Sequence, residues 1–241
     1  MKVLLIFFLL ISSLFAKELT IAAASNVTYA IKPLIKEFNK KHPDIKVRFI
    51  LGSSGKLTAQ IRNQAPFDVF LSANMKYPNT LYKDGLAIEK PRVYAQGSLA
   101  LFSYKKRDLK SLNIVNNVDK IAIANPKTAP YGKAAYEVLK KQNLLEKNKK
   151  KLVYAENISQ TVQYAMTATD LGFIAKASLY SPRMKNFEES SNYMEIDNSL
   201  YSPIEQGIAL LNEKNETIKF SNFIFSKEAK NVFKSFGYIV K

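Results

Sequence analysis

The sequence contains no cysteine and a single histidine among its 241 residues. The lack of cysteine excludes disulfide bonds, thiolate metal sites, a cysteine nucleophile and a lipid attached to an N-terminal cysteine. One histidine alone does not build a transition-metal site. His42 precedes Pro43 at the end of a predicted helix, so we interpret it as a solvent-exposed cap rather than a catalytic or metal-binding residue.

Motifs that mark common catalytic sites are also missing. The sequence has no Gly-x-Ser-x-Gly nucleophile elbow, which serine hydrolases of the α/β class require. It has no phosphate-binding Gly-Lys-Ser/Thr motif either, because Gly55-Lys56 is followed by Leu57. A Ser-His-Asp hydrolase would need His42 beside Ser25 or Ser54. We therefore predict that the protein is not an enzyme and carries no cofactor.

Long apolar runs are absent except near the N-terminus. There, Lys2 precedes a mostly apolar run over residues 3–14, and Ala16 precedes the charged pair Lys17-Glu18. This pattern predicts a secretory signal peptide over residues 1–16, cleaved after Ala16, although Leu14 is a poor match two positions earlier. The remaining chain is expected to be soluble and exported. A large exported chain without disulfides fits a bacterial periplasm.

Acidic residues are few relative to basic ones. The 36 lysines and arginines exceed the 20 acidic residues and give a net charge of +16, or about +15 without Lys2. The basic residues are dispersed, with clusters such as Lys105-Lys106-Arg107 and Lys149-Lys150-Lys151. We interpret these clusters as solvated surface, and export argues against a nucleic-acid partner.

The mature chain alternates strands and helices, which predicts an α/β fold with parallel strand pairing in one large domain or two lobes. The expected strands cover residues 19–24, 45–51, 67–72, 98–104, 121–124, 152–155, 171–175 and 204–211. The expected helices cover residues 27–41, 56–64, 79–84, 133–142 and 160–169, with further helical segments between 216 and 236. Pro33 indicates a kink or a later start of the first helix.

Two strand-to-helix junctions are led by serine. Ser25 follows the strand 19–24, and Ser54 follows the strand 45–51. Serine at an N-cap places a hydroxyl beside the free N–H groups of a helix's first turn, and these groups together with the helix dipole attract anions. The carboxyl ends of parallel strands gather at one edge of a sheet, so both junctions are candidates for one ligand site.

An ordered set of motifs resembles the periplasmic molybdate-binding proteins of ABC importers. The motifs are Ala22-Ala23-Ala24-Ser25, Gly52-Ser53-Ser54-Gly55-Lys56-Leu57, Phe67-Asp68-Val69-Phe70-Leu71-Ser72-Ala73 and Phe236-Gly237-Tyr238, and their order and spacing match through the whole mature chain. The resemblance implies a two-lobed type II periplasmic binding protein, each lobe a mainly parallel sheet flanked by helices, with the ligand between the lobes. It implies a first lobe of residues 17–96 plus 205–241 and a second lobe of residues 97–204.

The resemblance also implies a ligand set. The oxyanion ligands fall on Ser25 and Ser54 in the first lobe and on the backbone N–H groups of Tyr131 and Ile158 in the second. The metal would arrive as molybdate, or tungstate, rather than as a bare cation. A fifth ligand of this family, a tyrosine hydroxyl, falls on Ala175, so one donor is missing, and the adjacent Lys176 is a candidate to reach in.

Less specific interpretations remain for each residue. Ser25 and Ser54 also suit simple helix caps, Ile158 a core position, Tyr131 a surface aromatic, and Asp68 a structural carboxylate. The expected function is that of a monomeric solute-binding protein that delivers molybdate to an inner-membrane ABC permease. The alternatives are a receptor of the same fold for sulfate, another oxyanion or a ferric complex, an exported serine hydrolase, and a basic adhesin.

Overall fold

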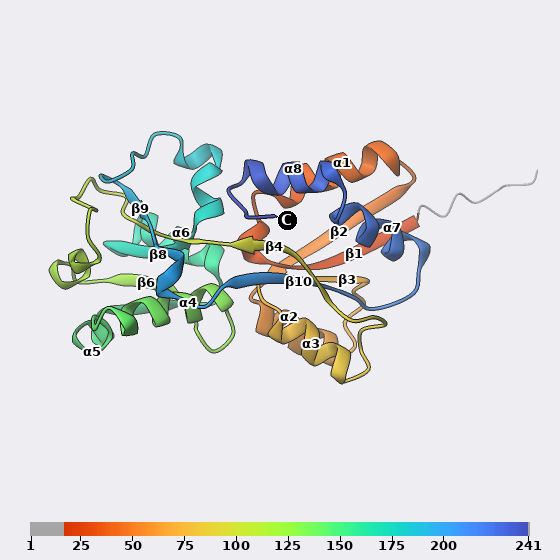
Figure 1. Cartoon of the computed structure of the whole chain (residues 1–241), viewed down its shortest axis with the longest axis horizontal. Coiled ribbons are helices and arrows are strands. Elements are labelled where there is room, and N and C mark those ends of the chain that lie inside the picture. Colours follow the sequence, from red (N-terminus) through yellow and green to blue (C-terminus); the bar gives the residue numbers. More distant parts are fainter. Residues whose placement is uncertain (1–16, 241) are drawn as a thin grey trace, which may run out of the picture.

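The computed structural model describes residues 17–240 (Figure 1). The predicted signal peptide, residues 1–16, and its cleavage after Ala16 lie outside the described residues. Within residues 17–240, no helix is long and apolar enough to cross a membrane.

Ten strands and eight α-helices form the described chain. The strands are β1 (Lys17–Ala24), β2 (Ile45–Gly52), β3 (Val69–Ser72), β4 (Arg92–Gly97), β5 (Leu99–Phe102), β6 (Ile121–Ala124), β7 (Leu152–Ala155), β8 (Leu171–Ala175), β9 (Tyr193–Glu195) and β10 (Ile204–Leu210). The helices are α1 (Ile31–Lys41), α2 (Ser54–Arg62), α3 (Lys76–Lys83), α4 (Pro130–Lys141), α5 (Leu145–Asn148), α6 (Ile158–Thr167), α7 (Asn215–Ile224) and α8 (Lys227–Ser235).

The strands form two five-stranded sheets. The first has the order β2-β1-β3-β10-β4, and the second has the order β7-β6-β8-β5-β9. In the first sheet β1 pairs in parallel with β2 and β3, whereas β10 runs antiparallel to β3 and β4. In the second sheet β6 pairs in parallel with β7 and β8, whereas β5 runs antiparallel to β8 and β9. In each sheet one strand, β10 or β5, therefore runs against the other four, so the sheets are mixed but mainly parallel, as predicted.

Helices cover both faces of each sheet, which explains why central strands such as β3, β6 and β8 are buried on both faces. In β1, Leu19 and Ile21 pack in one core with α1, α7 and α8, while Ala22 packs in a second core with α2 and α3. Figure 1 shows α1, α7 and α8 on one side of the first sheet and α2 and α3 on the other. In the second sheet, α4 and α5 contribute to one core, and residues of α6 contribute to a core on the opposite face.

We call the part built on the first sheet lobe I and the part built on the second sheet lobe II; the two lie side by side in Figure 1. The chain passes from lobe I to lobe II between β4 and β5 and returns before β10. The predicted limits at residues 96/97 and 204/205 stay a prediction. They lie beside Gly97 and Ile204, which are paired across β4 and β10.

Local sequence signals explain how the first helix is placed. The 3.6-residue period buries Ile31, Leu34 and Phe38 on one face of α1, as expected for an amphipathic helix. The helix begins at Ile31 rather than at Val27, so Pro33 lies in its first turn, where a proline N–H is not needed. His42 is the C-cap residue of this helix, and its ring packs 4.7 Å from the ring of Phe38.

Asp68 is a structural carboxylate, as we had favoured. Its Oδ2 atom accepts a hydrogen bond at 2.6 Å from the N–H of Thr20, which lies within β1. Its Oδ1 atom accepts from Asn212 Nδ2 at 2.7 Å and from Lys214 Nζ at 2.8 Å, beyond the end of β10. This buried side chain therefore ties together three segments of lobe I that are distant in sequence.

Candidate functional site

The four residues predicted to bind the ligand line one buried cavity between the lobes. Ser25, Ser54, Tyr131 and Ile158 are 4%, 0%, 1% and 4% exposed. The remaining lining residues are Ala24, Asn26, Gly52, Ser53, Ala73, Ala129 and Pro130. The cavity volume is about 10 Å³. This is about the space that one water molecule needs, so the two lobes lie nearly closed on the site.

Strand register brings the four turns together. In lobe I, Ala24 of β1 is the register partner of Gly52 of β2. In lobe II, Ala124 of β6 is the register partner of Ala155 of β7. Neighbouring parallel strands therefore end level with each other in both lobes, and each end delivers one turn to the cavity. This is the edge of an α/β sheet at which ligands bind.

Ser25 lies in a short 3₁₀ turn, not at the N-cap of a long helix as we had predicted. The turn covers Ser25–Val27, and α1 begins only at Ile31. The carbonyl oxygen of Ser25 accepts a hydrogen bond from Ser159 Oγ of lobe II at 2.8 Å. Ser159 Oγ also shares a hydrogen bond with Thr28 Oγ1 at 2.7 Å. Closure of the lobes thus involves the Ser25 peptide itself.

We had predicted Ser54 as an N-cap residue, but it is the first residue of α2 and lies one position after the N-cap. Ser53 is the N-cap residue, and its side chain makes no capping hydrogen bond. The Ser54 Oγ atom accepts a hydrogen bond from the N–H of Ala73 at 3.0 Å. Because a hydroxyl both donates and accepts, this contact leaves the hydroxyl proton of Ser54 available to a ligand. The Ser54 N–H lies in the first turn and has no partner within the helix.

Lobe II contributes the first turns of two helices. Tyr131 is the second residue of α4, after Pro130, and Ile158 is the first residue of α6. Their N–H groups belong to the first turn, which leaves them free for a ligand. The Asn157 side chain caps α6 by accepting from the N–H of Gln160 at 3.0 Å, so it does not compete for the N–H of Ile158.

A glycine allows α4 to begin this close to its strand. A Cβ atom on Gly132 would lie 2.0 Å from the carbonyl oxygen of Ala124, the last residue of β6. No real Cβ atom lies this close to an oxygen. The first turn of α4 can therefore pack against the end of β6 only with glycine at position 132. The position of the Tyr131 N–H depends on this close approach.

The side chain of Tyr131 is buried, which contradicts the interpretation as a surface aromatic. Its hydroxyl oxygen accepts a hydrogen bond from Gln206 Nε2 of β10 at 3.1 Å. A Cβ atom on Gly97, the last residue of β4, would overlap with this hydroxyl. The Tyr131 side chain therefore reaches both segments that connect the lobes. Burial raises the pKa of the Tyr131 hydroxyl well above its usual value, so the group is neutral.

Asn26 is a cavity residue that we did not predict. Its Nδ2 atom donates to Gln206 Oε1 at 3.0 Å and to the Tyr238 hydroxyl at 3.1 Å. Its Oδ1 atom is buried and has no hydrogen-bond partner among the described residues. A buried polar atom without a partner is costly, so this acceptor is a group that a water molecule, or a ligand with a hydrogen-bond donor, would satisfy. In the sequence, the only sign that Asn26 belongs to the site is its position directly after Ser25.

The position on which the resemblance places a tyrosine ligand, Ala175, does not line the cavity. Ala175 is buried, and Lys176 does not line the cavity either. The Lys176 ammonium instead pairs with the Glu195 carboxylate at 2.7 Å. Our suggestion that Lys176 reaches into the site is therefore wrong.

The cavity wall carries no charged side chain. A charged pair follows two of the cavity-lining turns in the chain, where Lys56 Nζ lies 3.8 Å from Glu156 Oε1. The same carboxylate accepts a hydrogen bond from Ser53 Oγ at 3.4 Å. Among residues 17–240 there is no group of three or more histidines, cysteines or acidic residues that could hold a metal cation. The site therefore offers neutral hydrogen-bond donors and no ligands for a bare cation.

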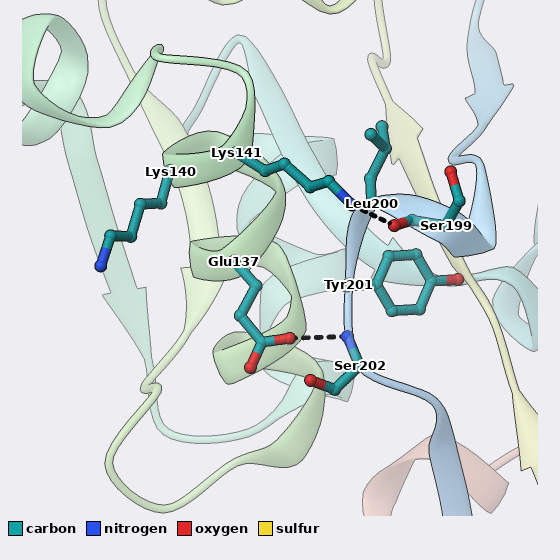
Figure 2. A pocket seen from close by; sticks show the side chains of 7 residues that line it. All are labelled: Glu137, Lys140, Lys141, Ser199, Leu200, Tyr201 and Ser202. Carbon is teal, nitrogen blue, oxygen red and sulfur yellow. Dashed lines mark hydrogen bonds between the residues drawn. The ribbon is translucent and has the colours of Figure 1, made fainter.

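A larger hollow lies on lobe II, away from these turns. It has a volume of about 570 Å³ and is open, with Glu137, Lys141 and Ser202 among its lining residues (Figure 2). Two of its charged side chains already have partners, since Glu137 accepts from the N–H of Ser202 at 2.7 Å and Lys141 donates to the Ser199 carbonyl at 2.7 Å. We therefore assign no binding role to this hollow.

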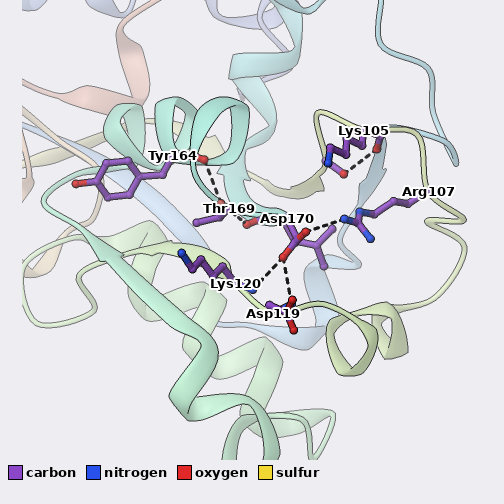
Figure 3. Close-up of polar contacts among 9 residues, drawn as sticks. Lys105, Arg107, Asp119, Lys120, Tyr164, Thr169 and Asp170 are labelled. Atoms are coloured by element: carbon purple, nitrogen blue, oxygen red, sulfur yellow. Dashed lines mark hydrogen bonds and ion pairs between the residues drawn. The ribbon is translucent and has the colours of Figure 1, made fainter.

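A second hollow of about 350 Å³ borders Arg107 and Asp170. As Figure 3 shows, the Asp170 carboxylate accepts from Arg107 and from the N–H groups of Asp119 and Lys120. Burial alone would raise the pKa of Asp170, but the two backbone hydrogen bonds and the charge of Arg107 outweigh it and lower the pKa. Arg107 thus anchors the start of β8, and this member of a basic cluster is more than solvated surface.

Known proteins provide an independent view of the chain. Residues 19–239 match the sequence profile of a family described as bacterial extracellular solute-binding protein. The chain belongs to this family.

Individual relatives show which kind of solute-binding protein this chain resembles. This solute-binding protein is 34% identical to the molybdate-binding protein ModA of Azotobacter vinelandii, over 92% of this chain and 90% of the relative. It is 33% identical to the molybdate-binding protein ModA of Rhodobacter capsulatus, over 94% and 90% of the two chains. The structure of the periplasmic molybdate-binding protein of A. vinelandii superposes with a TM-score of 0.84 and 30% identity, covering 92% of this chain and 99% of that one. The predicted two-lobed fold and the resemblance to molybdate-binding proteins are confirmed.

Proposed function

We propose that this solute-binding protein captures molybdate, or tungstate, in the periplasm and delivers it to an inner-membrane ABC permease. The observation that carries the proposal is the convergence of four turns, two from each lobe, on one small buried cavity without charged side chains. The relatives that share a third of its sequence are named molybdate-binding proteins. In this proposal Ser25, Ser54, Tyr131 and Ile158 bind the oxyanion.

The donor set is strong enough for useful affinity. Two hydroxyl groups and the backbone N–H groups of the four turns supply about six donors, each worth roughly 1.5–3 kcal/mol toward a charged acceptor. Their sum, about 9–18 kcal/mol, exceeds the cost of immobilising the ligand, which is about 4 kcal/mol or more. Micromolar to nanomolar binding requires only about 8–12 kcal/mol.

Neutral donors select by protonation state. A fully ionised oxyanion accepts every hydrogen bond, whereas hydrogen phosphate brings a proton that most of this cavity cannot accept. Asn26 is the exception, because its unpartnered Oδ1 atom is an acceptor. This chemistry favours molybdate, tungstate and sulfate, and the size of the closed cavity then distinguishes among them.

The same geometry argues for binding rather than catalysis. Of the residues that the structure describes along the cavity wall, none is histidine, aspartate or glutamate. Ser25 and Ser54 therefore have no general base to activate them, which a serine hydrolase needs. A ferric complex would instead call for anionic oxygen ligands, which the cavity wall does not offer.

Delivery would follow from lobe closure. Each lobe holds two of the four turns, so an open form presents half of the donors and the anion completes the set by bridging the lobes. The permease would then recognise the closed form, and the protein would act as a monomer without a cofactor.

Isothermal titration calorimetry with molybdate, tungstate, sulfate and phosphate tests the proposal. We expect sub-micromolar binding of molybdate and tungstate at one site per chain, and weaker binding of sulfate and phosphate. Preferred binding of sulfate would reassign the receptor to another oxyanion. Absence of binding to all four anions, with the fold intact by circular dichroism, would refute it.

A further inference from the structure

The two lobes touch directly at a point beside the cavity, through residues that do not line it. The N–H of Gly55 in lobe I donates to the carbonyl oxygen of Thr128 in lobe II at 2.9 Å. The Tyr77 hydroxyl of α3 lies within hydrogen-bond distance of the same oxygen, at 3.4 Å, and of the Lys127 carbonyl oxygen, at 3.3 Å. We call Gly55, Tyr77 and Thr128 the rim contact.

The rim contact lies next to two of the predicted ligands. Gly55 follows Ser54, and Thr128 is three residues before Tyr131. The turn that carries Thr128 is held internally, because the N–H groups of Thr128 and Ala129 both donate to the Asn125 carbonyl, at 3.1 and 2.8 Å. A force on the Thr128 carbonyl is therefore transmitted to the first turn of α4.

We propose that Gly55 and Tyr77 are positioning residues, which hold the turn at Thr128 against lobe I and so place the Tyr131 N–H on the ligand. This inference rests on the proposed oxyanion function. Neither residue lines the cavity, so both act through Thr128 and only when the lobes are closed.

The glycine itself supports this role. A Cβ atom at position 55 would lie 2.8 Å from the Tyr77 hydroxyl and 3.0 Å from Thr128 Cα. Gly55 lies within α2, and its backbone is not in the left-handed region that requires glycine. Alanine is the better helix former, so the helix alone does not favour glycine here. The close approach of Thr128 explains the choice.

Because the lobes also touch elsewhere, the rim contact alone does not hold them together. The turn at Ile158 is held separately, by the hydrogen bond from Ser159 Oγ to the Ser25 carbonyl. Loss of the Tyr77 hydroxyl should therefore loosen one of several inter-lobe contacts, with a moderate effect on ligand release rather than complete loss of binding.

Tyr77→Phe tests the inference, with Tyr82→Phe as the matched control. Tyr82 lies on the same helix, is 45% exposed, and its hydroxyl makes no hydrogen bond among the described residues. We expect Tyr77→Phe to raise the molybdate dissociation rate about three- to tenfold, the effect of one lost hydrogen bond, with an association rate within twofold of wild type. Tyr82→Phe should change neither rate. Stopped-flow measurements give both rates.

Gly55→Ala provides the stronger perturbation. We expect at least tenfold faster molybdate dissociation, while the melting temperature without ligand stays equal or rises because alanine favours the helix. A loss of affinity accompanied by a lower melting temperature would assign the effect to misfolding of α2 and overturn the interpretation.

A distance measurement separates this inference from the proposed function. The chain has no native cysteine, so spin labels at Lys83→Cys in lobe I and Lys140→Cys in lobe II report the inter-lobe distance alone. We expect Tyr77→Phe and Gly55→Ala to shift the ligand-free distribution toward longer distances. Unchanged distributions in both variants would refute the positioning role. If wild type binds no oxyanion, the proposed function fails, and the ligand-free distances still decide whether the rim contact holds the lobes.

Discussion

Replacing Ser54 with alanine should weaken molybdate binding and destabilise lobe I by two separable effects. Ser54 is fully buried, and its hydroxyl has one observed partner, the N–H of Ala73 at 3.0 Å. Losing one donor to a charged ligand costs about 1.5–3 kcal/mol, which lowers the affinity roughly ten- to 150-fold. Leaving the Ala73 N–H without an acceptor costs about 1–3 kcal/mol of folding stability.

Calorimetric titration measures the first effect, and thermal unfolding without ligand measures the second. A stability loss of this size lowers the melting temperature by about 2–12 °C for a chain of this length. Thr58→Val is the matched control. It removes a buried hydroxyl from the next turn of the same helix, where the hydroxyl donates to the Ser54 carbonyl at 2.8 Å, and it should leave the affinity within twofold. Unchanged molybdate affinity in a folded Ser54→Ala protein would refute the assignment of the site.

Three further changes have distinct expected outcomes. Asn26→Asp adds a negative charge to the cavity wall, where repulsion of about 4 kcal/mol per pair of unit charges at 4 Å should lower the molybdate affinity more than a hundredfold by calorimetry; retained binding would argue against an anion in this cavity. Gly132→Ala forces a Cβ atom onto the Ala124 carbonyl, so molybdate binding should be lost or lobe II unfolded, as followed by titration and circular dichroism. Asp68→Asn removes the charge that pairs the buried Asp68 with the exposed Lys214 and weakens its hydrogen bonds, so it should cost about 1–3 kcal/mol, seen in denaturant unfolding, without changing the affinity.

Much of the fold could be predicted because the local signals agreed with the tertiary structure. Strands β6 and β8 lie where their apolar runs begin and end, since both are central strands buried on both faces. The direction of β10 could not be predicted in the same way. Its sequence is as apolar as that of a parallel strand, and its antiparallel pairing with β3 depends on the long return from lobe II.

The candidate site was predicted unevenly for similar reasons. Ser25 and Ser54 carry a visible signal, a hydroxyl after an apolar strand. Tyr131 and Ile158 are proposed to bind through backbone groups, which leave no trace in side-chain identity, so they were predicted only through the resemblance. Asn26 was missed because its importance lies in an unpartnered atom, and hydrogen-bond partners such as Gln206, 180 residues away, are invisible before folding.

The position of β10 has a consequence for how the chain matures. Residues 204–210 occupy the place between β3 and β4 in the first sheet, so a chain that emerges from its N-terminus cannot complete lobe I until nearly nine-tenths of it is available. Lobe II is continuous in sequence and has no such requirement. As the chain folds, the second lobe can therefore reach its native state first, while the early strands β1, β2 and β3 still have an apolar edge unpaired. In that interval the protein is most exposed to aggregation, and a chaperone would have most effect on its yield.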